Sequence, residues 1–152
     1  DRTHFALAQF AFWLLAATDG HAKNFSIFHH RGGTFRLTPL YDVISAWPII
    51  GNGPNLIAAH KARLAMGLHS NNTHYKLSEI RARHWMDLAR RCGVPGVWEQ
   101  MLEMARGVGV ALEGVQSRLP AHYPGRVWDK VRSGMTRHAN QFMREADSIR
   151  AV

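Results

Sequence analysis

The sequence predicts a mainly α-helical domain with one small β-hairpin. Its 152 residues suit a single hydrophobic core, and 46% of them are apolar. Residues 3–17 form an apolar stretch of helical length, and two short alternating runs flank Gly32-Gly33. Beyond residue 78, apolar residues recur at helical spacing, with breaks at Gly93 and Pro120. These three observations favour helices over an extended sheet.

The first predicted helix covers residues 3–17 and is apolar almost all round. Only Gln9 interrupts it, so we expect the helix to be buried on most sides. The polar turn formers of residues 18–20 end it. The apolar part, residues 5–17, is shorter than the roughly 20 residues that cross a membrane, so we expect no membrane insertion.

The predicted hairpin pairs residues 25–29 with residues 34–38, and Pro39 ends its second strand. Residues 46–59 are rich in turn formers and are expected to be irregular. A short strand is expected at residues 63–66, within a stretch that shows no clear pattern.

Three helices are predicted in the C-terminal half. Ser78 is the expected N-cap of a helix that ends at Cys92 before Gly93. The second helix runs from Val97 to about Leu119. The third covers residues 124–149, and its expected inner face consists of Val127, Trp128, Val131, Met135, Phe142 and Ile149.

Charge and cysteine content narrow the function classes. The formal net charge of +8 favours nucleic acid, an anionic cofactor or an acidic protein as partner, although a solvated basic surface explains it equally well. Cys92 is the only cysteine, so no disulfide forms within the chain and no cysteine-based zinc site exists. This fits a reducing, cytoplasmic location. The missing initiator Met suggests a piece of a longer protein.

The segment from Thr18 to Ser45 carries the chemistry. Asp19 and Asn24 lie five residues apart on one polar loop, and Asp42 follows the predicted hairpin. Magnesium-dependent phosphoryl transfer needs one carboxylate to take the proton of the nucleophile, and a second carboxylate and an amide oxygen to hold the metal. A hairpin would return Asp42 to the side of the loop. The order of loop, hairpin and Asp therefore predicts a phosphotransfer site.

These residues resemble a known family. Two stretches are similar to the catalytic and metal-binding motifs of HipA-type serine/threonine kinases, the toxins of bacterial toxin–antitoxin pairs; they read Thr18-Asp19-Gly20-His21-Ala22-Lys23-Asn24-Phe25-Ser26 and Leu37-Thr38-Pro39-Leu40-Tyr41-Asp42-Val43-Ile44-Ser45. Residues 61–66 and 74–80 also resemble that family, and the likeness fades in the last helices. It implies that residues 1–152 are the C-terminal lobe of a protein-kinase-like, HipA-type fold, without the N-terminal lobe that grips ATP.

The resemblance implies ATP and Mg2+ as cofactors and a role for each site residue. Asp19 would be the catalytic base, and Asn24 and Asp42 would bind the metal. His21 and Lys23 would contact the phosphates, and would take part with Asn24 in cofactor binding and with Asp19 in catalysis. Lys23 could instead pair with Asp19.

Partners also follow from the resemblance. It implies a protein substrate such as an aminoacyl-tRNA synthetase, an antitoxin with a DNA-binding domain, and growth arrest. A weak or indirect DNA contact through arginines of the helix after Ser78 is also expected; these are Arg81, Arg83, Arg90 and Arg91.

Simpler readings remain for each residue. Asp19-Gly20 is a common turn pair, Asn24 suits a turn, and Asp42 could cap a following helix. His21 and Lys23 could be structural hydrogen-bond donors. Residues 51–55 could form a phosphate loop or a surface turn. The rival function is a non-catalytic basic helical module that binds an antitoxin or DNA.

Overall fold

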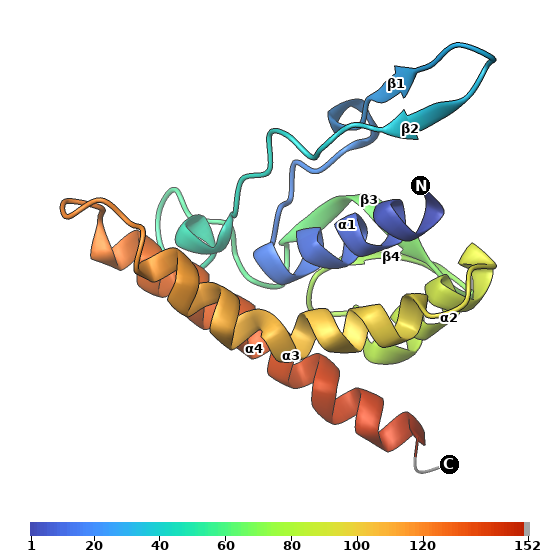
Figure 1. The fold of residues 1–152 in the computed structure, drawn as a ribbon. Helices are drawn as coiled ribbons and strands as arrows, with labels where there is room; N and C mark the ends of the chain where they lie inside the picture. Colours follow the sequence, from blue (N-terminus) through green and yellow to red (C-terminus); the bar gives the residue numbers. More distant parts are fainter. Residues whose placement is uncertain (151–152) are drawn as a thin grey trace.

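The computed structural model describes residues 1–150, which form a helical body with a projecting β-hairpin (Figure 1). The fold is mainly helical, as predicted. In chain order the elements are α1 (Arg2–Leu15), the 3-10 turn η1 (Ala22–Asn24), β1 (Ile27–His29), β2 (Phe35–Leu37), the 3-10 turn η2 (Trp47–Ile49), β3 (Arg63–His69), β4 (Thr73–Lys76), α2 (Ala82–Cys92), α3 (Val97–Gln116) and α4 (Gly125–Arg150).

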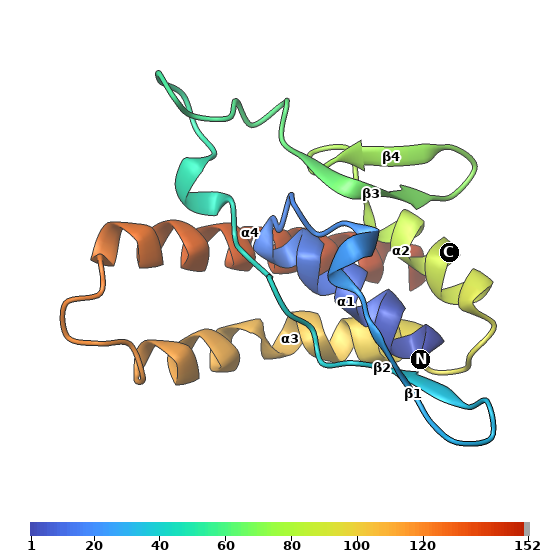
Figure 2. The same ribbon diagram turned by 90° about the horizontal axis from the view of Figure 1, so that it is seen from above.

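Helix α1 is the centre of the body. It contacts α2, α3 and α4, and α3 and α4 run antiparallel beside it (Figure 2). This position follows from its composition, because a helix that is apolar on nearly all sides is stable only when neighbours cover it. Even Gln9 is buried, as are Phe10, Phe12, Trp13 and Leu14.

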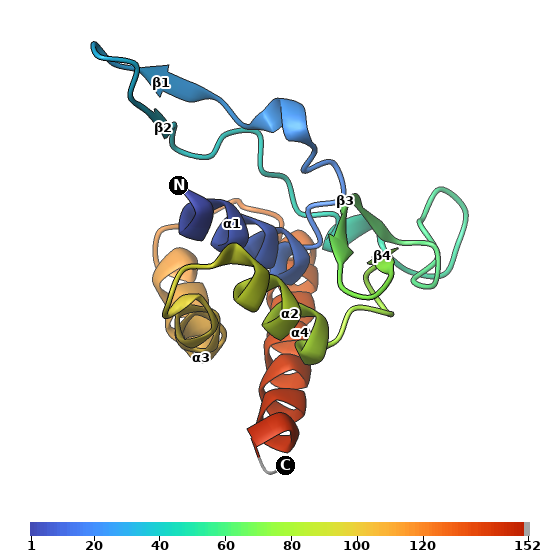
Figure 3. The same ribbon diagram turned by 90° about the vertical axis from the view of Figure 1, so that its right-hand side faces the viewer.

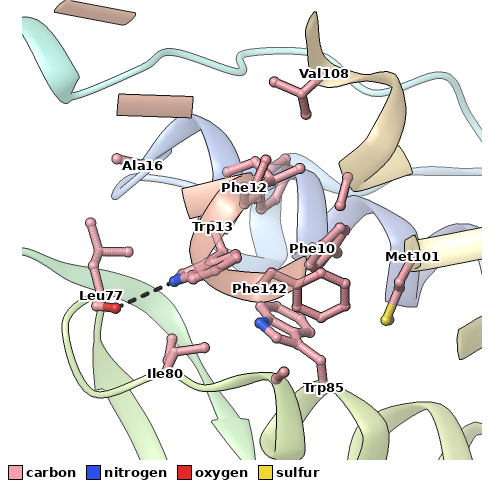
Figure 4. Packing of buried hydrophobic residues seen from close by; sticks show 14 of the residues in the cluster. Phe10, Phe12, Trp13, Ala16, Leu77, Ile80, Trp85, Met101, Val108 and Phe142 are labelled. Atoms are coloured by element: carbon pink, nitrogen blue, oxygen red, sulfur yellow. Dashed lines mark hydrogen bonds between the residues drawn. The ribbon is translucent and has the colours of Figure 1, made fainter. Parts of the chain in front are cut away.

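Aromatic side chains from three helices meet in the core (Figure 4). The centre of the Phe10 ring lies 5.1 Å from the ring centre of Trp85 in α2 and 4.7 Å from that of Phe142 in α4. The indole N–H of Trp13 donates to the carbonyl of Leu77 at 3.3 Å, which satisfies a buried polar group. The predicted inner face of α4 is confirmed at Phe142 and Trp128, which are both buried.

The strands form two separate antiparallel hairpins (Figure 3). The predicted hairpin is present, with Ile27 opposite Leu37 and His29 opposite Phe35. The expected strand at residues 63–66 is too short. It extends to residue 69 and pairs with β4, because Ser70-Asn71-Asn72 turns the chain back and Leu64 and Leu68 are buried against the body.

Three helix ends differ from the predicted ones. Helix α1 ends at Leu15, because Ala16 adopts a left-handed conformation with φ of 50°. Helix α2 begins at Ala82 rather than after Ser78, and Glu145 of α4 accepts a hydrogen bond from the Ala82 N–H at 2.8 Å. This carboxylate adds to a local contact, in which Nδ1 of His84 accepts the N–H of Arg81 at 3.2 Å. Helix α3 ends at Gln116, three residues before the expected Leu119.

Among residues 1–150, no helix combines the length and the hydropathy needed to cross a bilayer.

Candidate active site

The polar loop leaves α1 through a tight turn at Gly20. A Cβ at this position would lie 2.5 Å from the ring of Phe12, so only glycine lets the loop pack onto the helix. The Gly20 N–H donates to the carbonyl of Ala17 at 3.1 Å, and the His21 N–H donates to that of Asp19 at 2.9 Å. The loop is therefore held against the end of α1.

Asn24 and Asp42 meet across the hairpin. Asn24 is buried, and its Nδ2 donates to Oδ2 of Asp42 at 3.2 Å. Its Oδ1 accepts the N–H of His21 at 3.1 Å. The hairpin thus returns the chain as the sequence predicts, and two side chains that are 18 residues apart come into contact.

Asp19 lies on the same loop but turns toward His21. Its Oδ1 is 4.0 Å from Nε2 of His21, and its side chain is 87% exposed. The contacts of the described residues include none between Asp19 and either Asn24 or Asp42. The structure therefore joins two of the three predicted residues and leaves the third accessible from solvent.

His21 and Lys23 have different surroundings. Nδ1 of His21 is buried and has no hydrogen-bond partner among residues 1–150, while its Nε2 faces Asp19. Within residues 1–150, the Lys23 ammonium lies near no carboxylate, so the alternative pairing of Lys23 with Asp19 is not formed. The backbone carbonyl of Lys23 instead accepts the hydroxyl of Tyr41 at 3.0 Å.

The segment around Asp42 has an unusual backbone. Asp42 has φ of 55°, a left-handed conformation that few non-glycine residues adopt. The reading of Asp42 as a helix cap is wrong, because no α-helix starts there and the next helical turn is η2. Beside it, the Tyr41 hydroxyl also lies 2.8 Å from Oγ of Ser26. Tyr41 therefore ties the two arms of the site together, a role that its position in the motif did not reveal.

The end of α1 also holds the chain that follows Asp42. Its last carbonyls have no partner within the helix. Oγ of Ser45 donates to the carbonyl of Leu15 at 2.6 Å, and the indole N–H of Trp47 donates to that of Leu14 at 2.9 Å. The N–H of Ala46 donates to the carbonyl of Ala16 at 3.0 Å. Sequence reasoning missed these anchors, because Trp47 lies in a stretch read only as irregular.

A fourth donor reaches the same helix end from α4. Nδ1 of His138 lies 2.9 Å from the carbonyl of Trp13, and its ring stacks on the Trp13 indole at 4.3 Å. The carbonyl can only accept, so Nδ1 carries the proton. Burial lowers the pKa of His138 to about 4, against the opposing effect of this hydrogen bond.

The donor atoms fit magnesium. Mg2+ prefers carboxylate and amide oxygens, and Asp42 and Asn24 carry one of each, although the atom of Asn24 that contacts Asp42 is Nδ2, while its Oδ1 accepts the N–H of His21. The Asn24 Oδ1 accepts one hydrogen bond and keeps a second lone pair. Within the described part of the chain, no three His, Cys, Asp or Glu residues gather as a metal cluster. A cation here would thus be shared with a ligand such as a nucleotide phosphate.

Residues 51–55 form a closed turn. An isolated bridge joins Ile50 to Ile57, and the loop between them contains Asn55 with φ of 65°. The loop follows η2 and opens no helix, so the surface-turn reading describes it.

All four arginines suggested for DNA have partners within the chain, and Nε of Arg83 lies 3.2 Å from Nε2 of His84. Arg81 pairs with Glu145 at 3.2 Å, Arg90 pairs with Asp87 at 3.9 Å, and Arg91 donates to the carbonyl of Ser70 at 2.9 Å. These contacts give the arginines structural roles in and around α2.

Comparison with known proteins identifies the family and the fold. A family model described as "HipA-like C-terminal domain" matches residues 1–115. The fold is also similar to a chain in the complex of the Shewanella oneidensis MR-1 toxin–antitoxin proteins HipA and HipB with their operator DNA. The TM-score is 0.78 at 19% identity, over 99% of this chain and 33% of that one. The chain thus spans about a third of the length of that relative. Since the family model matches well over half of the sequence, the chain belongs to the family of HipA-like C-terminal domains.

Proposed function

We propose that this domain is the catalytic lobe of a serine/threonine protein kinase that transfers the γ-phosphoryl group of ATP to a protein hydroxyl. The contact between Asn24 and Asp42 is the observation that carries the proposal. It brings the Asn24 amide beside the Asp42 carboxylate, next to a loop on which Asp19 is exposed, and this supports a shared site for a phosphate-bound cation. Membership of the HipA-like family supports the same reaction.

Each residue has a part in this reaction. Bound magnesium would neutralise charge on the phosphates of ATP. Asn24 and Asp42 would hold it through their oxygen atoms. Asp19 accepts the proton of the substrate hydroxyl, and its exposure leaves it open to an incoming protein chain. His21 lies beside Asp19, and it and Lys23 contact the phosphates from the same loop.

A further lobe would complete the nucleotide site. The solved relative is about three times as long as this chain. Between α1 and the β1–β2 hairpin lies a largely apolar groove of 680 Å³, which includes Leu7, Phe28 and Leu40. Phe28 and Leu40 are exposed. We infer that the ATP-gripping lobe packs there, and that residues 1–152 alone bind nucleotide weakly.

The test is phosphotransfer by the product of the complete reading frame that contains this chain. We expect magnesium-dependent labelling of a protein serine or threonine from γ-labelled ATP. Asp19→Asn should lower the rate by roughly 10² to 10⁴-fold, the usual contribution of a general base. The matched control is Asp129→Asn, which changes an exposed carboxylate on α4, away from the loop that carries Asp19. It should leave the rate unchanged. Full activity of Asp19→Asn would refute the assignment of the base.

Partners are proposed from the solved relative and from the family resemblance. Its complex contains the antitoxin HipB and operator DNA. We propose an antitoxin partner with a DNA-binding domain, and a protein substrate such as an aminoacyl-tRNA synthetase. Direct DNA binding by α2 has less support, because its arginines are engaged by Glu145, Asp87 and Ser70.

A further inference from the structure

Trp47 joins three parts of the molecule that lie far apart in the sequence. Its indole N–H donates to the carbonyl of Leu14 at 2.9 Å, within the last turn of α1. Its backbone N–H donates to Oγ of Ser45 at 3.3 Å, and that hydroxyl donates to the carbonyl of Leu15. Trp47 is only 5% exposed, so this connection is shielded from water.

Helix α4 forms the surface on which the indole rests. A Cβ at Gly134 would collide with the Trp47 ring, so the absence of a side chain there is what admits the indole. The guanidinium of Arg137 lies 4.8 Å from the centre of the indole, and the ring of His138 meets it edge-on at 4.7 Å. Trp47 is therefore held against α4 by its ring and against the end of α1 by its N–H.

This anchor lies close to Asp42 along the chain. Only Val43 and Ile44 separate Asp42 from Ser45, and both are exposed, Ile44 at 70%. Asp42 itself is exposed and held in a left-handed conformation. Its position thus depends on ties at either end, the Tyr41 and Asn24 contacts on one side and the Ser45–Trp47 anchor on the other.

The loop with Asp19 leaves the same helix end. Gly20 packs on Phe12, and the N–H of Ala17 donates to the carbonyl of Phe12 at 2.8 Å. The end of α1 is therefore a common base for the loop that carries Asp19 and for the segment that carries Asp42.

We propose that Trp47 is a positioning residue for the cation site: by tying residues 45–47 to the end of α1 and to α4, it sets where the Asp42 carboxylate stands relative to Asn24. This inference rests on the cation site of the proposed function. It adds α4, which lies outside the part matched by the family model, to the structure that supports that site. Groups that orient metal ligands from outside the ligand set commonly change metal affinity by 10-fold or more.

The experiment measures cation binding directly. Mn2+ serves as the probe, and its electron paramagnetic resonance signal is compared with and without the product of the complete reading frame at one fixed ATP concentration, because ATP itself binds Mn2+. Trp47→Phe keeps the buried ring but removes the N–H donor, and Ser45→Ala removes the other side-chain tie. We expect each to weaken Mn2+ binding roughly 10-fold. The matched control is Trp128→Phe, because Trp128 is a buried tryptophan whose Nε1 has no hydrogen-bond partner.

Thermal melting of the same variants separates positioning from general loss of stability. We expect Trp47→Phe to weaken Mn2+ binding far more than Trp128→Phe at comparable melting temperatures. Equal Mn2+ affinities in Trp47→Phe, Ser45→Ala and Trp128→Phe would overturn the positioning role. Mn2+ binding that Asp42→Asn leaves unchanged would overturn it too, since there would be no site to position. If the wild-type protein binds Mn2+ through Asp42 but transfers no phosphoryl group, the proposed kinase function is refuted and the positioning role of Trp47 is not.

Discussion

The buried imidazole of His138 makes the stability of the domain depend on pH. His138 is 6% exposed, packs against Trp13 and Trp47, and has a pKa of about 4 in the folded protein, because burial disfavours its charged form. In the unfolded chain the pKa returns to about 6.5. Between these values the unfolded chain binds the proton and the folded protein does not, so acid favours unfolding.

The magnitude follows from the two pKa values. The stabilising effect of the neutral imidazole is complete above pH 6.5 and falls by about 1.4 kcal/mol per pH unit as the pH drops toward 4. Over that window the loss is about 3 kcal/mol, a large share of the free energy of unfolding of an ordinary domain. The charge of the neighbouring Arg137 acts in the same direction as burial.

The assay is urea unfolding at pH 7.5, 6.5, 5.5 and 4.5, with His138→Asn as the reference. An Asn side chain can still donate to the carbonyl of Trp13 but does not titrate. We expect the difference in unfolding free energy between wild type and variant to change by 2 to 3 kcal/mol, roughly, from the highest to the lowest pH. His84, whose pKa burial also lowers, titrates in both proteins and cancels. A difference that stays constant with pH would refute the reasoning.

Three further changes test the packing by thermal melting. Gly134→Ala should destabilise the domain by about 1 to 3 kcal/mol, because the new methyl group collides with the indole of Trp47; an unchanged melting temperature would mean that the ring can move aside. Gly109→Ala, in open space on α3, should stabilise it by about 0.5 to 1 kcal/mol, and a loss of stability would contradict this account of the helix. Glu145→Gln should lower the free energy of unfolding by about 1 kcal/mol, because it weakens the hydrogen bond to the Ala82 N–H at the start of α2. An unchanged melting temperature would mean that this hydrogen bond does not stabilise the domain.

Local patterns were sufficient to predict most of the helices and the first hairpin. Apolar spacing located α1, α3 and α4, and Gly32 and Gly33, both with positive φ, turn the hairpin as expected. The second hairpin was missed in part, because its return strand is short and exposed and carries little apolar signal. The start of α2 was misplaced because its cap, Glu145, lies 63 residues away in the sequence.

The site was predictable only where its residues follow one another closely. The order of Asp19, Asn24 and Asp42 around a hairpin predicted that all three side chains gather at one cation site, and the structure brings only Asn24 and Asp42 into contact. The orientation of Asp19 toward His21 depends on rotamers that no pattern encodes. The fit of Trp47 onto Gly134 joins positions with no recognisable common motif, so sequence reasoning could not find it.

The dependence of Trp47 on α4 has a consequence for how this domain can be divided. The stretch recognisable as a family ends at residue 115, yet the last helix begins ten residues later, at Gly125. A chain trimmed to the recognisable stretch would leave the indole of Trp47 uncovered and remove the imidazole that meets Trp13. We therefore expect a fragment that stops at residue 115 to be less stable than one that retains the final helix.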